Sequence, residues 1–403
     1  MLKHISTHQL QMGMYIHQFC GSWLDHSFWK AGFVLDSRED LQRLQRSNLS
    51  GLWIDTAKGR DLPETSSAPT PSTPPPPLPA KAATAATPRA SMNEEVQRAI
   101  KLCAHSRKAV MAMFQEVRMG QALEMHHAEE LVVQMSESLM RHPDALISLA
   151  RLKSADDYTY MHSVAVCALM LATARQLGLS EEYIRLAGIA GLLHDVGKLT
   201  IPDSILNKPQ KLSDSEFERV KLHPEAGGVI LRQSHDVDAL VLDVCLHHHE
   251  KADGSGYPHH LAGNQISLFA QMGAVCDVYD AVTSNRPYNR GWDPAEAIQR
   301  MSTWTGHFDQ RVFQAFVKSV GIYPVGALVR LESGRLGVVI EQNPKSLLTP
   351  KVRVFFSTRS NLPLEQSVVD LAKVQGQDRI LARETPEDWE FKNLEQLWNP
   401  LPA

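Results

Sequence analysis

The chain has 403 residues, 43% of them hydrophobic, so it is too long for one ordinary core and two or three folded units are expected. The formal charge is only −4 and no long block of Lys and Arg occurs, which argues against a protein that binds long nucleic acid. No apolar run approaches the roughly 18 residues of a membrane span, and the N-terminus has no continuous hydrophobic signal region. These observations predict a cytoplasmic protein.

The N-terminal residues 1–58 are expected to form a small α/β module. Apparent strands cover Met14–Gln18 and Leu52–Asp55, and a short helix is expected to begin near Ser37. Residues 59–91 follow as a linker, because they are mostly Pro, Ala, Ser and Thr and include four consecutive prolines at 74–77. A tether is a commoner use of such a segment than a proline motif that binds a partner.

The region 92–320 is predicted to be an all-helical domain. Apolar residues recur every three or four positions from Val96 to Val117, and further helices are expected from about Ala122 to Met140 and from His162 to Leu177. The fold class is therefore mainly α.

Beyond residue 321 the hydrophobic pattern changes from helical spacing to strand-like alternation. A Ser333-Gly334 turn separates two alternating runs, and residues 352–357 read as a third strand. We expect a small β-module over 322–372, acting either as a structural cap or as a partner-binding unit, and a weakly ordered tail over 373–403.

Two motifs contain the candidate catalytic and metal-binding residues. Residues 192–198 read LLHDVGK, and residues 248–258 read HHEKADGSGYP. On a predicted helix, the His194 imidazole can hold one metal while the Asp195 carboxylate bridges two, and Lys198 lies on the same face, where its cation can neutralise a phosphate oxygen. An isolated His-Asp pair is more often a surface feature. Here, however, five further imidazoles and carboxylates occur in or beside apolar segments, namely His162, His223, His248, His249 and Asp277. Burying such a side chain costs free energy unless it is paired or bound to a metal.

With VYDAVTSNRPY at 278–288, these motifs closely resemble the HD-GYP family, a branch of the HD phosphohydrolase superfamily. The resemblance covers about Tyr158 to Phe316. It implies hydrolysis of the bacterial messenger cyclic di-GMP to linear pGpG, and in some members on to GMP, with effects on biofilm and motility signalling. The N-terminal module resembles a small domain of unknown role that often precedes this catalytic domain.

The resemblance also implies roles for individual residues. The catalytic group would be His194, Asp195 and Lys198. Two divalent ions, iron or manganese, would be held with Asp195 as the bridge. Their ligands would be His162, His194, Asp195, His223, His248, His249 and Asp277. Substrate would be contacted by Lys198, Gly256, Tyr257, Pro258, Arg286 and Arg290. His247 is interpreted as supporting its helix, and Glu250 and Asp253 as shaping the loop.

The sequence departs from the family pattern at two positions. Members that hold three metals have a glutamate four residues before the first histidine, where this chain has Tyr158, and a phenol with a pKa near 10 is a poor ligand. Two metals are therefore expected, unless Asp157 replaces the glutamate through a register change. Asn289 stands where some relatives carry a cation, with Arg290 beside it.

Two other functions stay open at this point. One is a phosphohydrolase that acts on another cyclic dinucleotide or nucleotide. The other is a signalling protein that binds cyclic di-GMP, or a GGDEF-domain partner, without significant catalysis. A homo-oligomer is compatible with all three.

Overall fold

The computed structural model describes most of the chain in two compact units, residues 1–84 and 85–403. The described residues are 2–5, 9–20, 33–35, 37, 41, 51–56, 58–60, 90–150, 158–206, 208, 210–284, 291–343, 345–374, 376–391 and 393–398. Among them, no helix is long and apolar enough to cross a membrane.

The first unit contains a four-stranded antiparallel sheet in the order β1-β4-β2-β3. Its strands are β1 (Leu2–Ile5), β2 (Tyr15–Cys20), β3 (Phe33–Val34) and β4 (Gly51–Asp55). Ile5, Met14 and Ile54 are buried against it. The helix expected near Ser37 lies outside the described residues, apart from Ser37 and Leu41.

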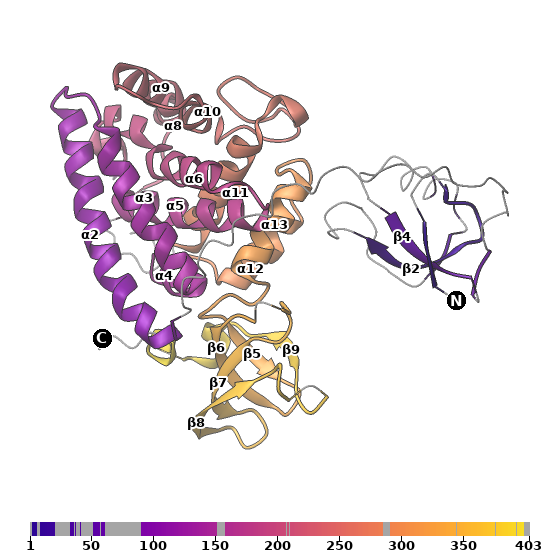
Figure 1. Ribbon diagram of the computed structural model, residues 1–403. Coiled ribbons are helices and arrows are strands. Elements are labelled where there is room, and N and C mark those ends of the chain that lie inside the picture. The colour runs from indigo at the N-terminus through magenta and orange to yellow at the C-terminus, as the bar shows by residue number, and fades with distance from the viewer. Residues whose placement is uncertain are drawn as a thin grey trace. The chain divides into compact units, whose positions relative to one another are not determined.

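The second unit begins with two long helices that lie side by side, α2 (Met92–Arg118) and α3 (Met125–Arg141) (Figure 1). Ser91 caps α2, since its hydroxyl accepts from the Glu94 backbone N–H while the Glu94 carboxylate accepts from the Ser91 N–H. The remaining helices are α4 (Pro143–Ala150), α5 (Tyr158–Gln176), α6 (Glu181–Leu193), the short 3₁₀ helix η3 (Val196–Thr200), α7 (Asp203–Leu206), α8 (Asp214–Val220), α9 (His223–Gln233), α10 (Ala239–His247), the 3₁₀ helix η4 (Gly263–Gln265), α11 (Leu268–Thr283), α12 (Pro294–Ser302) and α13 (Gln310–Val320).

Helix α5 lies at the centre of this unit and packs against α2, α4, α6, α11 and α13. Every residue from Met161 to Ala174 is buried, so the helix has no solvent-facing stripe. A histidine inside such a helix is removed from water and needs polar partners. This is the environment of His162.

The C-terminal β-module is a five-stranded antiparallel sheet in the order β8-β7-β6-β5-β9. The strands are β5 (Leu328–Leu331), β6 (Arg335–Glu341), β7 (Lys351–Ser357), β8 (Leu362–Asp370) and β9 (Ile380–Arg383). The expected turn joins β5 to β6, and Gly334 adopts a φ of 79°, which favours glycine.

The segment 373–403 differs from the weakly ordered tail expected there. Strand β9 pairs with β5, and two 3₁₀ helices, η5 (Pro386–Trp389) and η6 (Leu394–Leu397), follow it. Phe391 packs edge-on against Phe355, with ring centroids 5.0 Å apart. The aromatic residues of this segment therefore complete the core of the β-module.

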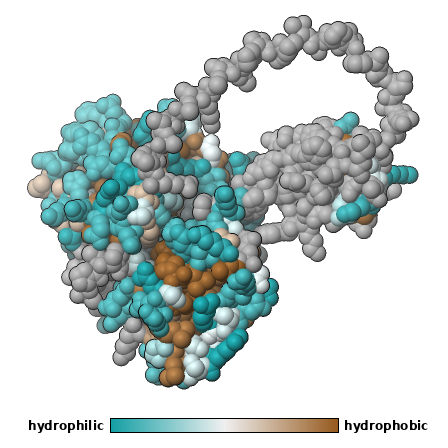
Figure 2. Space-filling view, turned by 60° about the horizontal axis from the view of Figure 1, so that its bottom comes forward, coloured by the Kyte–Doolittle hydropathy of each residue, from teal (hydrophilic) through white to brown (hydrophobic). Residues whose placement is uncertain are grey.

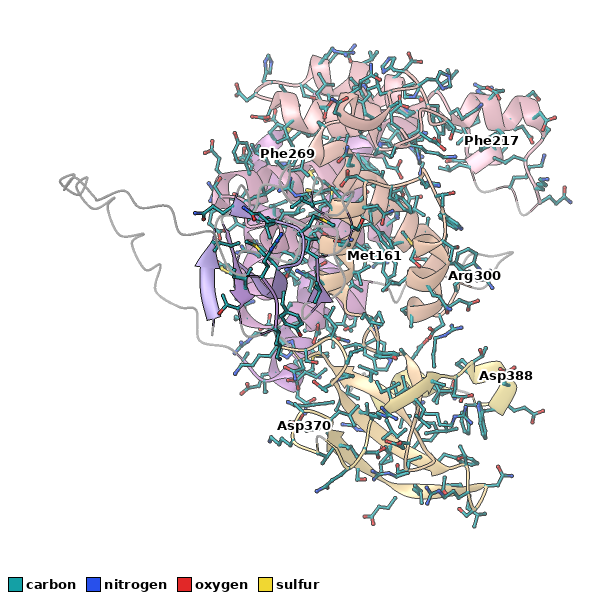
Figure 3. All side chains as sticks on the ribbon, turned by 90° about the vertical axis from the view of Figure 1, so that its right-hand side faces the viewer. Met161, Phe217, Phe269, Arg300, Asp370 and Asp388 are labelled. Atoms are coloured by element: carbon teal, nitrogen blue, oxygen red, sulfur yellow. The ribbon has the colours of Figure 1, made fainter. Side chains whose placement is uncertain are left out.

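Hydrophobic side chains form a strip on the face of the molecule shown in Figure 2. Within the β-module, the exposed apolar residues include Leu362, Leu364 and Val368 of the edge strand β8. Figure 3 shows the β-module, marked by Asp370 and Asp388, at one end of this unit and Phe217 of α8 at the other.

Candidate metal centre

His194 and Asp195 lie at a junction between two helices, which corrects the expectation of one continuous helix. Helix α6 ends at Leu193, His194 is its C-cap, and Asp195 is the N-cap of η3. Both side chains are buried. At this junction Nε2 of His194 lies 3.3 Å from Oδ2 of Asp195, so the imidazole and the carboxylate face the same point.

Gly197 explains the glycine of the LLHDVGK motif. A Cβ at this position would lie 1.9 Å from the backbone oxygen of His223 and 2.4 Å from the backbone nitrogen of Gly227. Only glycine therefore lets η3 lie directly against the start of α9. This contact brings His223 next to Asp195.

The structure brings all seven predicted ligands together, in two groups that share Asp195. The ligand atoms within each group lie within 4.8 Å of one another. One group is His162, His194, Asp195 and Asp277, and the other is Asp195, His223, His248 and His249.

The two carboxylate oxygens of Asp195 face different groups. Oδ2 lies 3.3 Å from Nε2 of His162 and 3.3 Å from Nε2 of His194. Oδ1 lies 3.2 Å from Nε2 of His223 and 3.7 Å from Nε2 of His248. A carboxylate placed in this way can bridge two cations.

Asp277 has a similar position on the other side of the site. Its Oδ1 lies 3.0 Å from Nε2 of His162 and 3.8 Å from Nε2 of His194. Its Oδ2 lies 3.7 Å from Nδ1 of His249. Asp277 comes from α11, so the centre joins side chains of α5, α9 and α11, of the residues directly after α10, and of the α6–η3 junction.

Three of the imidazoles are oriented through Nδ1, the nitrogen that faces away from the centre. Nδ1 of His194 lies 2.8 Å from the Gly191 carbonyl oxygen, and Nδ1 of His223 lies 2.8 Å from that of Val220. His248 likewise directs Nδ1 to backbone carbonyls at 3.0 and 3.1 Å. A carbonyl fixes the proton on Nδ1, so each Nε2 offers its lone pair to the centre.

Two of the histidines are held in the neutral form that binds metal. Burial and the neighbouring imidazoles hold the pKa of His248 well below its ordinary value. Burial also lowers the pKa of His249 to about 3. Protons therefore do not compete for these two imidazoles at neutral pH.

The carboxylates at the centre are ionised. Burial opposes the charge on Asp195, but Lys198 and the adjacent histidines hold its pKa well below the ordinary value. Burial likewise opposes the charge on Asp277, but the adjacent imidazoles of His162, His194 and His249 hold its pKa well below the ordinary value. Buried negative charge of this kind calls for a compensating cation.

The donor set fits divalent metal ions. Nε2 of His194 and Oδ1 of Asp195 are buried and have no hydrogen-bond partner in the described part of the chain. Buried polar atoms rarely lack a partner, and a metal ion supplies one for both. Mixed imidazole and carboxylate ligands are typical of iron and manganese sites.

The predicted substrate loop borders this centre. The Tyr257 ring stacks on His249, with centroids 4.7 Å apart, and the Tyr257–Pro258 peptide bond is cis. Gly256 is required, because a Cβ there would lie 2.4 Å from the Lys251 nitrogen and 2.6 Å from the His249 oxygen. Lys198 reaches the centre as well, since its Nζ donates to Oδ2 of Asp195.

Glu250 holds the loop in place from the buried side. The sequence had suggested that this residue shapes the loop. Its side chain is buried, and its carboxylate accepts from the backbone N–H of His259 at 2.7 Å and of Leu261 at 3.1 Å. The predicted contacts Arg286 and Arg290 lie outside the described residues, as do Asn289, Asp157 and the side chain of Tyr158.

One residue was missed by the sequence analysis. Asp280 is buried one helical turn after Asp277, and its Oδ2 lies 2.6 Å from Nδ1 of His162. The Asp-x-x-Asp spacing was the available signal, because it places both carboxylates on one face of α11.

Comparison with known proteins agrees with this geometry. Residues 118–312 match the family model of the HD domain, and residues 2–128 match that of a domain of unknown function, DUF3391. A cyclic di-GMP phosphodiesterase of Pseudomonas aeruginosa is 57% identical over 402 residues, which cover 100% of this chain and 96% of the relative. The chain belongs to the HD-GYP family.

Two further relatives match this chain over less than half of its length. The cyclic di-GMP phosphodiesterase response regulator of Xanthomonas campestris pv. campestris is 39% identical over 196 residues, which cover 47% of this chain and 51% of the relative. A 3'3'-cGAMP-specific phosphodiesterase of Vibrio cholerae serotype O1 is 35% identical over 164 residues, which cover 40% of this chain and 38% of the relative.

Proposed function

We propose that this chain is a metal-dependent phosphodiesterase that hydrolyses cyclic di-GMP to pGpG, with GMP as a further product. The observation that carries the proposal is the position of Asp195, whose two oxygens face two separate sets of histidines. The P. aeruginosa relative, which is similar over the whole chain, is named a cyclic di-GMP phosphodiesterase.

We further propose that the centre holds two ions, iron or manganese. Two bound divalent cations supply an activated water and stabilise the charge that gathers on the phosphate. The seven ligands would hold this pair, and Asp195, which directs one oxygen to each group of histidines, would be shared between the two ions. His194 and Asp195 are thus catalytic because they fix the position of the reacting groups.

Lys198 and the loop complete the site on the substrate side. Lys198 places a cation beside Asp195, where it can bind a phosphate oxygen of the substrate. Tyr257 presents an aromatic ring next to His249, suited to contact with a guanine, and Gly256 and Pro258 fix its backbone. Arg286 and Arg290 stay predictions as phosphate contacts, as do a GGDEF-domain partner and a homo-oligomer.

The test is anaerobic purification, metal analysis and an assay on cyclic di-GMP. We expect two ions per chain and turnover in the wild type, and loss of both in Asp195→Ala. A matched pair of variants sharpens the test: His248→Ala removes a ligand, whereas His247→Ala removes its sequence neighbour, which bonds to Asp243 and His259 instead. A metal-loaded wild type that leaves cyclic di-GMP intact contradicts the proposal.

A second substrate has specific support. A relative at 35% identity over the catalytic region is named as specific for 3'3'-cGAMP, a different cyclic dinucleotide. Competition between cyclic di-GMP and 3'3'-cGAMP in one reaction separates the two candidates, because the ratio of kcat/KM values measures the preference directly.

A further inference from the structure

The substrate loop is hydrogen-bonded to a distant segment of the chain, residues 303–309, which connect α12 to α13. The backbone N–H of Ala252 donates to the His307 carbonyl oxygen at 3.1 Å. The N–H of Asp253 donates to the Gly306 carbonyl oxygen at 2.8 Å. The α12–α13 connection therefore contacts the loop three residues after the metal ligands at its start.

The same two residues are also paired with the other end of the loop. The Ala252 carbonyl oxygen accepts from the Gly263 N–H at 2.9 Å, and Asp253 forms an isolated β-bridge with Ala262. The base of the loop is thus fixed by hydrogen bonds to two backbone segments, its own end and the α12–α13 connection. Tyr257 lies between the paired positions in the chain, so this base determines where its ring is presented.

Gly306 permits the close approach of the two segments. Its φ is 76°, a conformation that favours glycine, and a Cβ on it would lie 2.9 Å from both Cβ and Oδ2 of Asp253. Because Cβ of Asp253 is attached directly to the backbone, it cannot move aside without moving the loop. The Asp253 carboxylate also accepts from the Ser255 N–H at 2.9 Å, so a displacement of Asp253 is passed on toward the GYP motif.

The α12–α13 connection is itself held in place by aromatic packing. Phe308 is buried and stacks on Phe313 of α13, with ring centroids 5.7 Å apart. The His307 ring lies 5.2 Å from the Trp304 ring, and Trp304 packs against Trp292 with centroids 6.2 Å apart. A segment anchored to the core in this way can serve as a fixed support for the loop.

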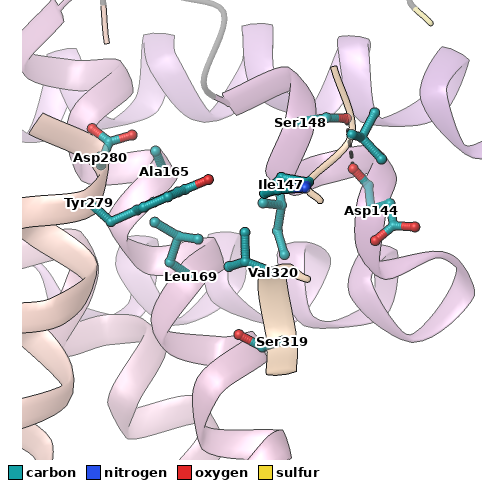
Figure 4. Close-up of a pocket in the computed structure, with 11 residues that line it drawn as sticks. Asp144, Ile147, Ser148, Ala165, Leu169, Tyr279, Asp280, Ser319 and Val320 are labelled. Atoms are coloured by element: carbon teal, nitrogen blue, oxygen red, sulfur yellow. Dashed lines mark hydrogen bonds between the residues drawn. The ribbon is translucent and has the colours of Figure 1, made fainter. Parts of the chain in front are cut away.

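The protein is closely packed behind His162, on the side of Asp280. Asp280 lines a cavity there of only about 20 Å³, together with Tyr279, Leu169 and Val320 (Figure 4). That volume holds about one water molecule. This side of the metal centre has no room for a nucleotide, which leaves the loop side for contacts with the substrate.

We propose that the α12–α13 connection positions the substrate loop, and that Gly306 is the residue that makes this contact possible. The proposal rests on the proposed function, because it takes the loop to contact cyclic di-GMP. Gly306 and His307 act on the loop through their backbone carbonyls, so they are positioning residues. Displacing the connection changes how the loop meets the nucleotide and leaves the seven metal ligands in place.

The first test replaces Gly306 with alanine. We expect Gly306→Ala to lower kcat/KM for cyclic di-GMP about tenfold, mainly through a higher KM, because a misplaced loop binds the substrate less well. The metal content is expected to stay at the wild-type value. Gly178→Ala is the matched control, because Gly178 has a φ of 73° but a Cβ there would meet nothing within 4 Å. It introduces similar backbone strain without touching the loop.

Hydrogen exchange provides a readout that needs no turnover. The N–H groups of Ala252 and Asp253 are expected to exchange about tenfold faster in Gly306→Ala than in the wild type or in Gly178→Ala, because their acceptors move away. Peptide-resolved mass spectrometry of the metal-loaded protein measures this exchange. If the wild type does not hydrolyse cyclic di-GMP, the proposed function fails, while the exchange rates still decide whether the connection holds the loop.

A double-mutant cycle tests the path of the effect. Asp253→Gly removes the Cβ with which Gly306→Ala would clash, so Gly306→Ala should lower kcat/KM much less in that background than in the wild type. Thermal melting checks that each variant folds. His307→Ala removes the packing against Trp304 and is a milder change that should shift exchange and KM in the same direction.

Three results would overturn the proposal. One is a pair of strictly additive effects in the cycle with Asp253→Gly. Another is loop exchange and KM that are the same in Gly306→Ala, His307→Ala and Gly178→Ala. The third is metal loss in Gly306→Ala, which would show that the connection supports the metal centre instead of the loop.

Discussion

Nδ1 of His162 lies 2.6 Å from Oδ2 of Asp280, while Nε2 of the same ring faces Asp195 and Asp277. The histidine is thus held between a carboxylate behind it and two carboxylates at the metal centre. Burial opposes its protonation, but hydrogen bonds to the three aspartates raise its pKa to about 10. Asp280 determines which nitrogen of His162 is offered to the metal centre.

Asp280→Asn is expected to weaken metal binding by about 10- to 100-fold. The neutral amide is a weaker acceptor than the carboxylate for Nδ1 of His162, so it fixes the imidazole ring less firmly. Metal retained after dialysis against graded chelator measures the effect. Asp243→Asn is the control, since Oδ1 of Asp243 contacts Nδ1 of His247 at 2.7 Å, but His247 is not part of the metal cluster. Equal metal retention in the two variants would contradict the assigned role of Asp280.

Glu250→Ala is expected to lower kcat/KM for cyclic di-GMP by about 100-fold and to leave the metal content intact. The carboxylate holds the backbone N–H groups of His259 and Leu261, so its loss frees the loop that carries Tyr257. Glu250→Gln keeps one acceptor oxygen and should lose less activity. Metal loss in Glu250→Ala would show that the residue supports the centre rather than the loop.

The helical domain and the chemistry of its site could be predicted because the relevant signals are local. Apolar residues at three-to-four spacing indicate α2 and α3, and histidines in apolar segments indicate buried polar partners. The assignment of individual ligands came from the resemblance to the HD-GYP family, not from spacing alone.

Other features depend on contacts that the local sequence does not show. The α6–η3 junction arises where Gly197 meets α9, so periodicity alone suggested one helix through Asp195. Strand β9 has only four residues, too few to show alternation, and it is defined by pairing with β5 about fifty residues earlier. The same holds for Asp280, whose partner is 118 residues away in the chain.

Tyr158→Glu is expected to raise metal occupancy from two ions to three. Tyr158 is the first residue of α5 and precedes His162 by four positions, so a carboxylate there lies on the same helical face as the ligand. Metal analysis of the purified protein measures the change, with Thr159→Glu as a control one residue out of register. Unchanged occupancy in Tyr158→Glu, or three ions in the wild type, would contradict the two-metal prediction.

Glu95 provides a prediction on stability that is independent of the metal centre. It is fully buried on α2, and its carboxylate accepts from Ser138 at 2.8 Å and from Arg141 at 2.8 and 3.0 Å. Burial opposes its charge, but these hydrogen bonds lower its pKa below the ordinary value. Removing the partner of a buried charge costs about 3–5 kcal/mol when nothing else compensates that charge, and Arg98 still donates to Glu95 at 3.4 Å, so Arg141→Met is expected to destabilise the protein by less than this at pH 7.

The pH dependence follows from the direction of the Glu95 shift. Because the folded-state pKa lies below the unfolded one, the stabilisation is fully present above the unfolded pKa and is lost as the pH falls through the folded value. The stability difference between wild type and Glu95→Gln should therefore shrink between pH 7 and acid pH. Urea unfolding of metal-free protein at several pH values measures it, with the exposed Glu129→Gln as control. A difference that stays constant down to pH values below the folded pKa would show that the charge of Glu95 contributes nothing.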